Sequence, residues 1–249
     1  MTPSNSKSIL ITGAARRVGA AIARRLHGAG CNVVIHCNRS RTEADALARE
    51  LNGTRPKSAT VVQGDLLAYN ALKGLIDHAA SEFGRLDGLV NNASTFYPTP
   101  VGRIDEDSWI DLIDSNLKAP LFLSQAAAPY LKKTQGGIVN IVDIHAERPL
   151  KDFVVYTIAK AGLAGLTRSL SIELAPEVRV NGVSPGAILW PDGGHDYPAA
   201  EQQRIVSQTP LQRTGAPDDI AGAVKYLLLD APYVSGQILA VDGGRSQNL

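Results

Sequence analysis

The sequence predicts a doubly wound α/β fold, a single domain over residues 1–249 in which a parallel sheet of about seven strands carries helices on both faces. Short β-branched runs alternate along the chain with longer segments rich in Ala, Leu and charged residues at helical spacing. No low-complexity linker or solenoid-length repeat divides the chain. Such regular alternation is typical of a parallel sheet covered by helices on both sides.

Each predicted strand is a short apolar run, and each predicted helix is a longer segment with the apolar periodicity of an amphipathic helix. The predicted strands are residues 8–12, 32–36, 60–63, 88–91, 137–142, 178–183 and 237–241. The predicted helices are residues 20–30, 42–51, 69–83, 108–130 and 154–174.

Three irregular stretches follow predicted strands, and we expect them to form the substrate loops. They are residues 93–107, 143–152 and 185–198. In an open α/β sheet, ligands bind outside the carboxyl ends of the strands, where such loops converge. The fold alone therefore predicts where the active site lies.

Charge and composition exclude several classes of function. The 25 Lys and Arg residues nearly balance 24 Asp and Glu residues, so no strong field attracts nucleic acid or an anionic membrane. The first seven residues have no apolar run, and the first such run that follows is too short to span a bilayer. We therefore expect a cytoplasmic protein that acts on a small molecule, with no nucleic-acid or membrane partner.

The two cysteines, Cys31 and Cys37, lie in or beside one predicted strand. Six residues of strand separate them by roughly 20 Å, which is too far for a disulfide within that strand. The five histidines are scattered, with no cluster at metal-ligand spacing. We expect reduced thiols and no metal site.

A glycine-containing loop follows the first predicted strand and leads into a helix. Its sequence, residues 12–19, is Thr-Gly-Ala-Ala-Arg-Arg-Val-Gly. Gly13 permits a sharp turn, and the small residues up to Gly19 let main-chain N–H groups approach a pyrophosphate at the positive end of the helix. The loop, with Val18, predicts a dinucleotide site of the Rossmann type; the alternative is an ordinary strand-to-helix turn.

The end of the second predicted strand indicates which dinucleotide binds. NAD sites place an acidic residue here for the ribose hydroxyls, whereas NADP sites supply cationic and hydroxyl donors for the 2′-phosphate. The strand is followed by Asn38, Arg39 and Ser40, and the next carboxylate is Glu43. We therefore expect NADPH; the alternative is that Arg39 is a solvated residue at a helix start.

A carboxylate also follows the third predicted strand, where Asp65 and Leu66 come directly after Gly64. The Asp65 carboxylate is placed to accept a hydrogen bond from an adenine amino group, and it is equally placed to cap a helix. We count Asp65 and Leu66 among the expected coenzyme contacts.

Tyr156 and Lys160 lie four residues apart in a predicted helix, so their side chains share one face. A phenol with a pKa near 10 is a poor proton donor or acceptor at pH 7. An adjacent ammonium favours the phenolate and brings the phenol towards the working range, and the same lysine is placed to hold a nicotinamide ribose. Alone, the pair also fits an ordinary surface helix.

In combination, these motifs resemble the short-chain dehydrogenase/reductase family over essentially the whole chain. The residues that carry the resemblance are Gly13, Gly19, Asp65, Asn91, Asn92, Ala93, Asn116, Tyr156, Lys160, Pro185 and Gly186. It implies that Asn91, Asn92 and Ala93 shape the coenzyme cleft, that the Pro185-Gly186 pair borders the coenzyme, and that Asn116 orders a water in a proton relay. It also implies Tyr156 as proton donor, Lys160 as its tuner, and a homotetramer with interfaces at residues 108–130 and 154–174.

One residue departs from the family pattern. Most members carry a serine about 13 residues before the tyrosine, at the end of the fifth strand, and this chain has Asp143 there. A carboxylate is a poor partner for a developing alkoxide, because the two negative charges repel. It suits a substrate that presents N–H donors or receives a proton on a ring nitrogen.

That pattern resembles the pteridine reductases within the family. Residues 12–19 are similar to their phosphate loop, including an arginine at Arg17, and residues 91–100 are similar to their substrate segment. By this resemblance Ser94 stands where most relatives have glycine, and Phe96 stacks on a pterin ring. Phe96 as a packing aromatic is the alternative, and Trp190 either walls the pocket or packs under a loop.

The sequence thus predicts an NADPH-dependent pteridine reductase in which Tyr156 donates the proton. We expect an oxidised or dihydro pterin of the biopterin, monapterin or folate type as substrate. Two alternatives stay open: a carbonyl or 3-oxoacyl reductase of the same family, which the missing serine argues against, and a non-catalytic NADPH-binding regulator, which the presence of Asn116, Tyr156 and Lys160 argues against.

Overall fold

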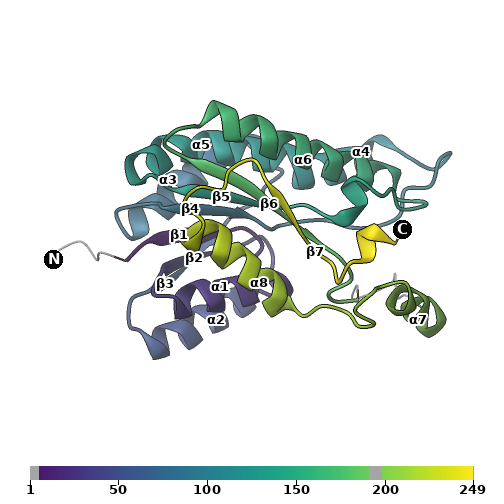
Figure 1. Cartoon of the computed structure of the whole chain (residues 1–249). Coiled ribbons are helices and arrows are strands. Elements are labelled where there is room, and N and C mark those ends of the chain that lie inside the picture. Colours follow the sequence, from purple (N-terminus) through teal and green to yellow (C-terminus); the bar gives the residue numbers. More distant parts are fainter. Residues whose placement is uncertain (1–5, 191–197, 249) are drawn as a thin grey trace.

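A parallel β-sheet forms the centre of the computed structural model, which describes residues 6–190 and 198–248 (Figure 1). Across those residues the sheet has seven strands in the order β3-β2-β1-β4-β5-β6-β7, and every pair is parallel. The strands are β1 (Ser8–Ile11), β2 (Asn32–Cys37), β3 (Ala59–Gln63), β4 (Gly88–Asn91), β5 (Gly137–Ile141), β6 (Arg179–Pro185) and β7 (Ile238–Val241). The predicted fold class is confirmed, and each predicted strand is present within two residues at either end.

Helices cover both faces of the sheet (Figure 1). One layer contains α1 (Arg17–Gly28), α2 (Arg41–Thr54) and α8 (Pro217–Lys225). The other contains α3 (Leu72–Glu82), α5 (Ala119–Thr134) and α6 (Val154–Glu173). The strand side chains alternate between the two layers: Ile9 and Ile11 pack towards the first, and Leu10 packs towards the second. Burial on both faces explains why β1 and β2 are mostly apolar, with Ser8, Asn32 and His36 as their buried polar residues.

Two helices have no counterpart among those predicted, namely α7 (Ala199–Ser207) and α8. The start of α8 does carry a recognisable signal, because Pro217 occupies its first turn and Asp219 accepts a hydrogen bond from the Ala216 N–H at 2.8 Å. α8 packs against α1 and completes its layer. The predicted helix at 69–83 begins as a 3₁₀ turn (Tyr69–Ala71) before α3.

The predicted helix at residues 108–130 is not a regular α-helix. It consists of α4 (Glu106–Ile113), a π-helical turn (Asp114–Lys118) and α5. Pro120, in the first turn of α5, has no N–H to donate to the carbonyl four residues earlier, which belongs to Asn116. The interruption therefore falls on Asn116, and π turns of this kind are frequent at functional sites.

The two loops that follow β1 and β4 meet at the point where the strand order reverses. β1 pairs with β2 on one side and with β4 on the other, so the chain leaves these adjacent strands in opposite directions. Gly13, with a φ of +60°, lies so close to this junction that a Cβ on it would be 2.9 Å from the Cα of Ala93. The Asn92 side chain donates to the Thr12 carbonyl at 2.8 Å. This junction is the crevice where ligands of such sheets bind.

Three further features concern the cysteines, membrane spans and metal sites. Cys31 and Cys37 are buried free thiols. In the described ranges, no helix has the length and apolar character needed to cross a membrane. Over the same ranges, no group of three His, Cys, Asp or Glu side chains is arranged to hold a metal ion.

Candidate active site

A cavity of about 480 Å³ opens at the carboxyl ends of the central strands and brings most of the predicted coenzyme residues together. Its lining consists of Gly13, Ala15, Arg16, Arg17, Val18, Gly19, Cys37, Asn38, Arg39, Ser40, Asn92, Ala93, Ser94, Ile141, Val142, Asp143, Tyr156, Lys160 and Pro185. Three of the predicted contacts, Asp65, Leu66 and Gly186, do not line it. We call this space the coenzyme cavity.

The phosphate loop borders the coenzyme cavity next to the start of α1. The helix has no acidic residue in its first turn and no capping side chain at Arg16, so side chains leave the positive helix end open to an anion. Arg17 has a φ of +54°, a conformation that costs a non-glycine residue on the order of 1 kcal/mol. Such a strained residue at a helix start points to a constraint imposed by function.

The other end of the coenzyme cavity carries the residues expected to select NADPH. Asn38, Arg39 and Ser40 line it together, and Glu43, the next carboxylate in the sequence, pairs with the guanidinium of Arg16 at 3.6 Å. The local charge is therefore suited to a 2′-phosphate.

Asp65 and Leu66 contribute less directly than expected. The Asp65 carboxylate accepts from the Leu67 N–H at 3.0 Å and from the Asn38 side chain at 3.3 Å. It therefore closes a local turn and does not cap the following 3₁₀ helix, whose N-cap is Ala68, while it contacts Asn38 of the coenzyme cavity. The Leu66 side chain packs in the core beside Leu72, so its predicted coenzyme contact is not made by the side chain.

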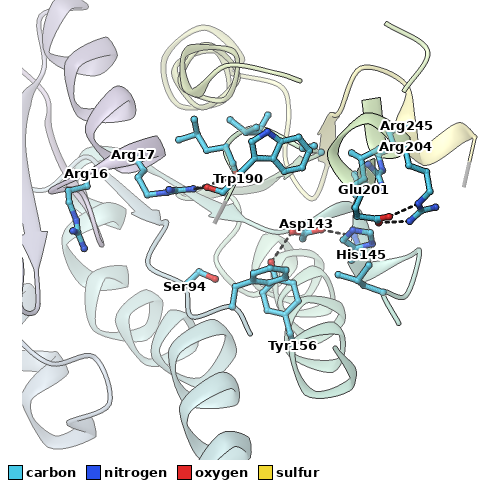
Figure 2. A pocket seen from close by; sticks show the side chains of 18 residues that line it. Arg16, Arg17, Ser94, Asp143, His145, Tyr156, Trp190, Glu201, Arg204 and Arg245 are labelled. Atoms are coloured by element: carbon cyan, nitrogen blue, oxygen red, sulfur yellow. Dashed lines mark hydrogen bonds and ion pairs between the residues drawn. The ribbon is translucent and has the colours of Figure 1, made fainter. Parts of the chain in front are cut away.

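Tyr156, Asp143 and Lys160 meet at the floor of the coenzyme cavity (Figure 2 shows the first two). The Tyr156 hydroxyl donates to the Asp143 carboxylate at 2.8 Å, and the other carboxylate oxygen accepts from the His145 N–H at 2.8 Å. The Lys160 ammonium donates to the Ile141 carbonyl at 2.9 Å and lies 5.6 Å from the centre of the Tyr156 ring. Asp143 is therefore held in a fixed orientation beside the phenol.

Lys160 is a buried cation, only 2% exposed. Burial lowers the pKa of Lys160 to about 8, and the Asp143 carboxylate opposes part of that shift. Because this pKa stays above 7, the ammonium is retained at neutral pH, where its positive charge stabilises a phenolate on Tyr156. The arrangement can deliver and recover a proton at the phenol oxygen.

Asn116 is 1% exposed and lies in the π-helical turn, which contacts α6. Its amide group donates to the carbonyls of Thr95 and Leu112 at 3.0 Å each, and its oxygen accepts from the Ser94 hydroxyl at 2.6 Å. The side chain is therefore engaged in holding residues 94–95. Two acceptors of Asn116 remain for the predicted water. One is its main-chain carbonyl, for which Pro120 supplies no N–H donor, and the other is the second lone pair of its side-chain oxygen.

A second cavity, also of about 480 Å³, adjoins the coenzyme cavity (Figure 2). Arg16, Arg17, Ser94, Asp143 and Tyr156 line both. The remaining lining consists of Phe96, Ile144, His145, Leu150, Gly186, Ala187, Ile188, Leu189, Trp190, Glu201, Arg204, Ile205 and Arg245. We call this space the substrate cavity, because it contains Tyr156 and the residues predicted to contact the substrate.

The predicted substrate residues all line the substrate cavity, and two of them make contacts that were not predicted. The Phe96 ring stacks on the Phe153 ring with 4.5 Å between ring centres, and it packs edge-to-face with the Tyr156 ring at 4.8 Å between centres. Phe96 therefore combines a packing role with a position in the cavity wall. The Arg17 guanidinium donates to the carbonyls of Leu189 and Trp190 at 3.4 and 2.9 Å. Arg17 thus joins the phosphate loop to the loop after β6. Residues 191–197 of that predicted loop lie outside the described residues.

Several residues of the substrate cavity were not predicted from the sequence. They come from η3 (Ile144–Ala146), within the predicted loop 143–152, and from α7 and the C-terminal turn (Arg245–Gln247), and the ionisable ones are His145, Glu201, Arg204 and Arg245. Glu201 and Arg204 form a two-point ion pair at 2.6 and 2.8 Å. No local motif marks Glu201, Arg204 or Arg245, because only the packing of α7 and of the C-terminal turn brings them to the site.

Comparisons with known proteins place this geometry in context. A family model described as enoyl-(acyl carrier protein) reductase matches residues 13–246. Pteridine reductase 1 of Leishmania tarentolae is 38% identical over 288 aligned positions, which cover 99% of each chain. An uncharacterised oxidoreductase of Methylorubrum extorquens is 35% identical, covering 98% of this chain and 99% of that protein. A 3-oxoacyl-[acyl-carrier-protein] reductase of Staphylococcus aureus is 34% identical, covering 96% and 98%.

Proposed function

The chain belongs to the short-chain dehydrogenase/reductase family, and from that premise we propose that it is an NADPH-dependent pteridine reductase. The observation that carries this proposal is the hydrogen bond from Tyr156 to Asp143 at 2.8 Å. It puts a carboxylate, and no serine hydroxyl, beside the proton donor.

NADPH fits the coenzyme cavity by the chemistry of the lining. The uncapped start of α1 suits the pyrophosphate, Arg39 and Ser40 suit the 2′-phosphate, and Lys160 suits the nicotinamide ribose. When bound, NADPH supplies the hydride for the reaction. The protein's own residues supply the proton and the orientation of the substrate.

A pterin fits the polar groups at the junction of the two cavities. The amino and ring N–H groups of a pterin donate hydrogen bonds, and a carboxylate such as Asp143 accepts hydrogen bonds. A ketone substrate would not offer such donors. Phe96 presents an aromatic wall in the same cavity, and flat heteroaromatic rings favour offset stacking on such a face. Arg17 and Ser94 line both cavities and are placed to contact the ring edge.

In the proposed reaction a C=N bond of the pterin is reduced. The carbon receives the hydride, and Tyr156 gives its hydroxyl proton to the adjacent nitrogen. Lys160 stabilises the resulting phenolate, and the relay through Asn116 returns a proton from water. Asp143 accepts from the substrate N–H groups once the Tyr156 hydrogen has turned from the carboxylate to the pterin nitrogen, so its negative charge meets hydrogen-bond donors and no developing alkoxide.

The experiment that tests this proposal compares substrates and one substitution. We expect the enzyme to oxidise NADPH with dihydrobiopterin, dihydromonapterin or dihydrofolate at a higher kcat/KM than with an acetoacetyl thioester. Asp143→Ser should lower kcat/KM for the pterin by at least about tenfold, since a charge-assisted hydrogen bond is lost.

Three results would count against it. If Asp143→Ser reduced dihydropterins as well as the parent, the role of the carboxylate would be wrong. If the parent preferred the thioester, the enzyme would be a 3-oxoacyl reductase, like the S. aureus relative. Tight NADPH binding without turnover of any substrate would favour a regulator.

We also propose a cytoplasmic homotetramer. Buried free thiols at Cys31 and Cys37 fit a reducing compartment. Exposed apolar side chains on α4 and α6, including Ile110, Ile158 and Ile172, fit a subunit interface. Sedimentation equilibrium measures the oligomeric state directly.

A further inference from the structure

One buried histidine joins two loops that flank the coenzyme cavity. His36 lies in β2 and is 1% exposed. Its Nδ1 atom lies 3.2 Å from the Gly13 nitrogen, and its Nε2 atom lies 3.1 Å from the Gly64 oxygen. Gly13 follows β1 and Gly64 follows β3, so one ring links the main chain at the ends of three adjacent strands.

The two partners fix the protonation of the ring. A carbonyl oxygen only accepts, so Nε2 carries the proton that is donated to Gly64, and Nδ1 keeps a lone pair for the Gly13 N–H. Burial lowers the pKa of His36 to about 4, against smaller opposing effects of the Gly64 hydrogen bond and the Asp65 carboxylate. At neutral pH the ring is therefore neutral and has one tautomer.

Main-chain hydrogen bonds beside the ring hold the same loops. The Ala14 N–H donates to the His36 carbonyl at 2.9 Å, and the Gly64 N–H donates to the Cys37 carbonyl at 3.0 Å. Because the Gly13 N–H is engaged by His36, it is not a donor to a pyrophosphate. That task falls to later N–H groups, at the start of α1, whose position depends on how the Gly13 turn is held.

We propose that His36 is a positioning residue for coenzyme binding, which holds the phosphate loop at Gly13 and the adenine-side loop at Gly64 in register. This inference rests on the proposed nicotinamide coenzyme and not on the identity of the reduced substrate. It assigns the ring no contact with the reacting atoms, so its removal should weaken NADPH binding and leave the chemical step intact.

Three substitutions separate the two contacts. His36→Asn keeps an acceptor near the Nδ1 position, His36→Gln keeps a donor near the Nε2 position, and His36→Phe keeps only the ring volume. We expect His36→Phe to raise the Kd for NADPH, measured by fluorescence titration, by about tenfold or more, with smaller increases for Asn and Gln. The kcat at saturating NADPH should stay within about twofold of the parent.

His27→Phe is the matched control. His27 is also buried, in α1, with its Nε2 atom 2.6 Å from the Ser58 hydroxyl, and it does not line the coenzyme cavity. It should lower the melting temperature without changing the Kd for NADPH.

Parent-like Kd values in the folded His36 variants would overturn the inference and leave His36 with a purely structural role. If His36→Phe does not fold, the Asn and Gln variants decide the question. If the His36 variants bind NADPH more weakly than the parent, but the parent reduces no pterin, the proposed substrate is refuted and the role of His36 is supported.

Discussion

The coenzyme cavity and the substrate cavity are built in different ways. The coenzyme cavity depends on close main-chain approach, as where Gly13 packs against Ala93 with no room for a Cβ atom. The substrate cavity is walled by side chains from distant parts of the chain, among them Phe96, Trp190 and Arg245. A cavity wall made of main-chain atoms needs small residues at a few positions. A cavity wall made of side chains changes its shape with every substitution of those side chains. The first therefore suits a shared coenzyme and the second suits a particular substrate.

Tyr156 and Asp143 stand at the boundary, because both line the two cavities. The difference between the cavities predicts that substitutions will separate into three kinds. Those at the boundary should affect the chemical step, those in the coenzyme cavity should affect NADPH affinity, and those in the substrate cavity should affect only the KM of the pterin.

The largest effect is expected at the boundary, from Tyr156→Phe. Loss of the hydroxyl removes the proton donor, and general acid catalysis is worth about 10²- to 10⁴-fold, so kcat should fall by roughly 10³-fold. The Kd for NADPH should change by less than about threefold, because the phosphate and ribose contacts stay in place. Steady-state kinetics and fluorescence titration measure the two quantities.

Tyr97→Phe is the control for this substitution. The Tyr97 hydroxyl donates to Asp111 at 3.0 Å, and Tyr97 packs against the cluster that contains Tyr156 but lies outside both cavity linings. It should leave kcat within about twofold, since a surface-near hydrogen bond of this kind contributes only ~1 kcal/mol to stability. A Tyr156→Phe enzyme with near-normal kcat would remove Tyr156 from the boundary altogether.

A smaller effect is expected in the coenzyme cavity, from Gly19→Ala. A Cβ atom there would lie 2.5 Å from the Gly13 carbonyl oxygen and 2.7 Å from the Asn92 amide nitrogen, so the phosphate loop must shift. The Kd for NADPH should rise by about tenfold, as expected for overpacking of about 1–3 kcal/mol, while kcat at saturation changes little.

Gly28→Ala, in the same helix, is the matched control, because a Cβ atom there meets nothing within 4 Å. It should leave the Kd for NADPH unchanged and keep or slightly raise the melting temperature. Equal Kd values for the parent, Gly19→Ala and Gly28→Ala would show that the coenzyme cavity tolerates side chains after all, and the contrast with the substrate cavity would fail.

The same contrast explains how much the sequence could predict. Gly13, Gly19 and the Asn38-Arg39-Ser40 run lie within a few residues of strand ends, and their positions follow from short-range order along the chain. The spacing of Tyr156 and Lys160 is likewise set by a single helix, α6. These local features were sufficient to select residues that the structure brings into one cavity, and the alternation of short apolar runs with helical segments was sufficient to predict the fold class.

Long-range packing accounts for what the sequence could not predict. α7 carries Arg204 to the substrate cavity, and the C-terminal turn carries Arg245, yet neither segment has a period or motif that points to the site. The register of His36 with the ends of β1 and β3 is also invisible in one dimension, because it depends on three strands pairing side by side. Phe96 stacks on Phe153, which is 57 positions later in the chain. This packing contact could not be predicted, because it depends on where α6 lies.

The smallest effect, and the most direct test of the substrate cavity, is expected from Phe96→Leu. An aromatic pair is worth about 0.5–1.5 kcal/mol beyond burial, so loss of stacking on the pterin should raise its KM by about two- to tenfold, with the Kd for NADPH unchanged. Phe153→Leu removes the other ring of the same stack without reaching the cavity lining. If Phe96 serves only packing, both variants will lower the melting temperature by a similar amount and leave the KM of the pterin unchanged. A KM increase confined to Phe96→Leu is the result that assigns its ring to the substrate.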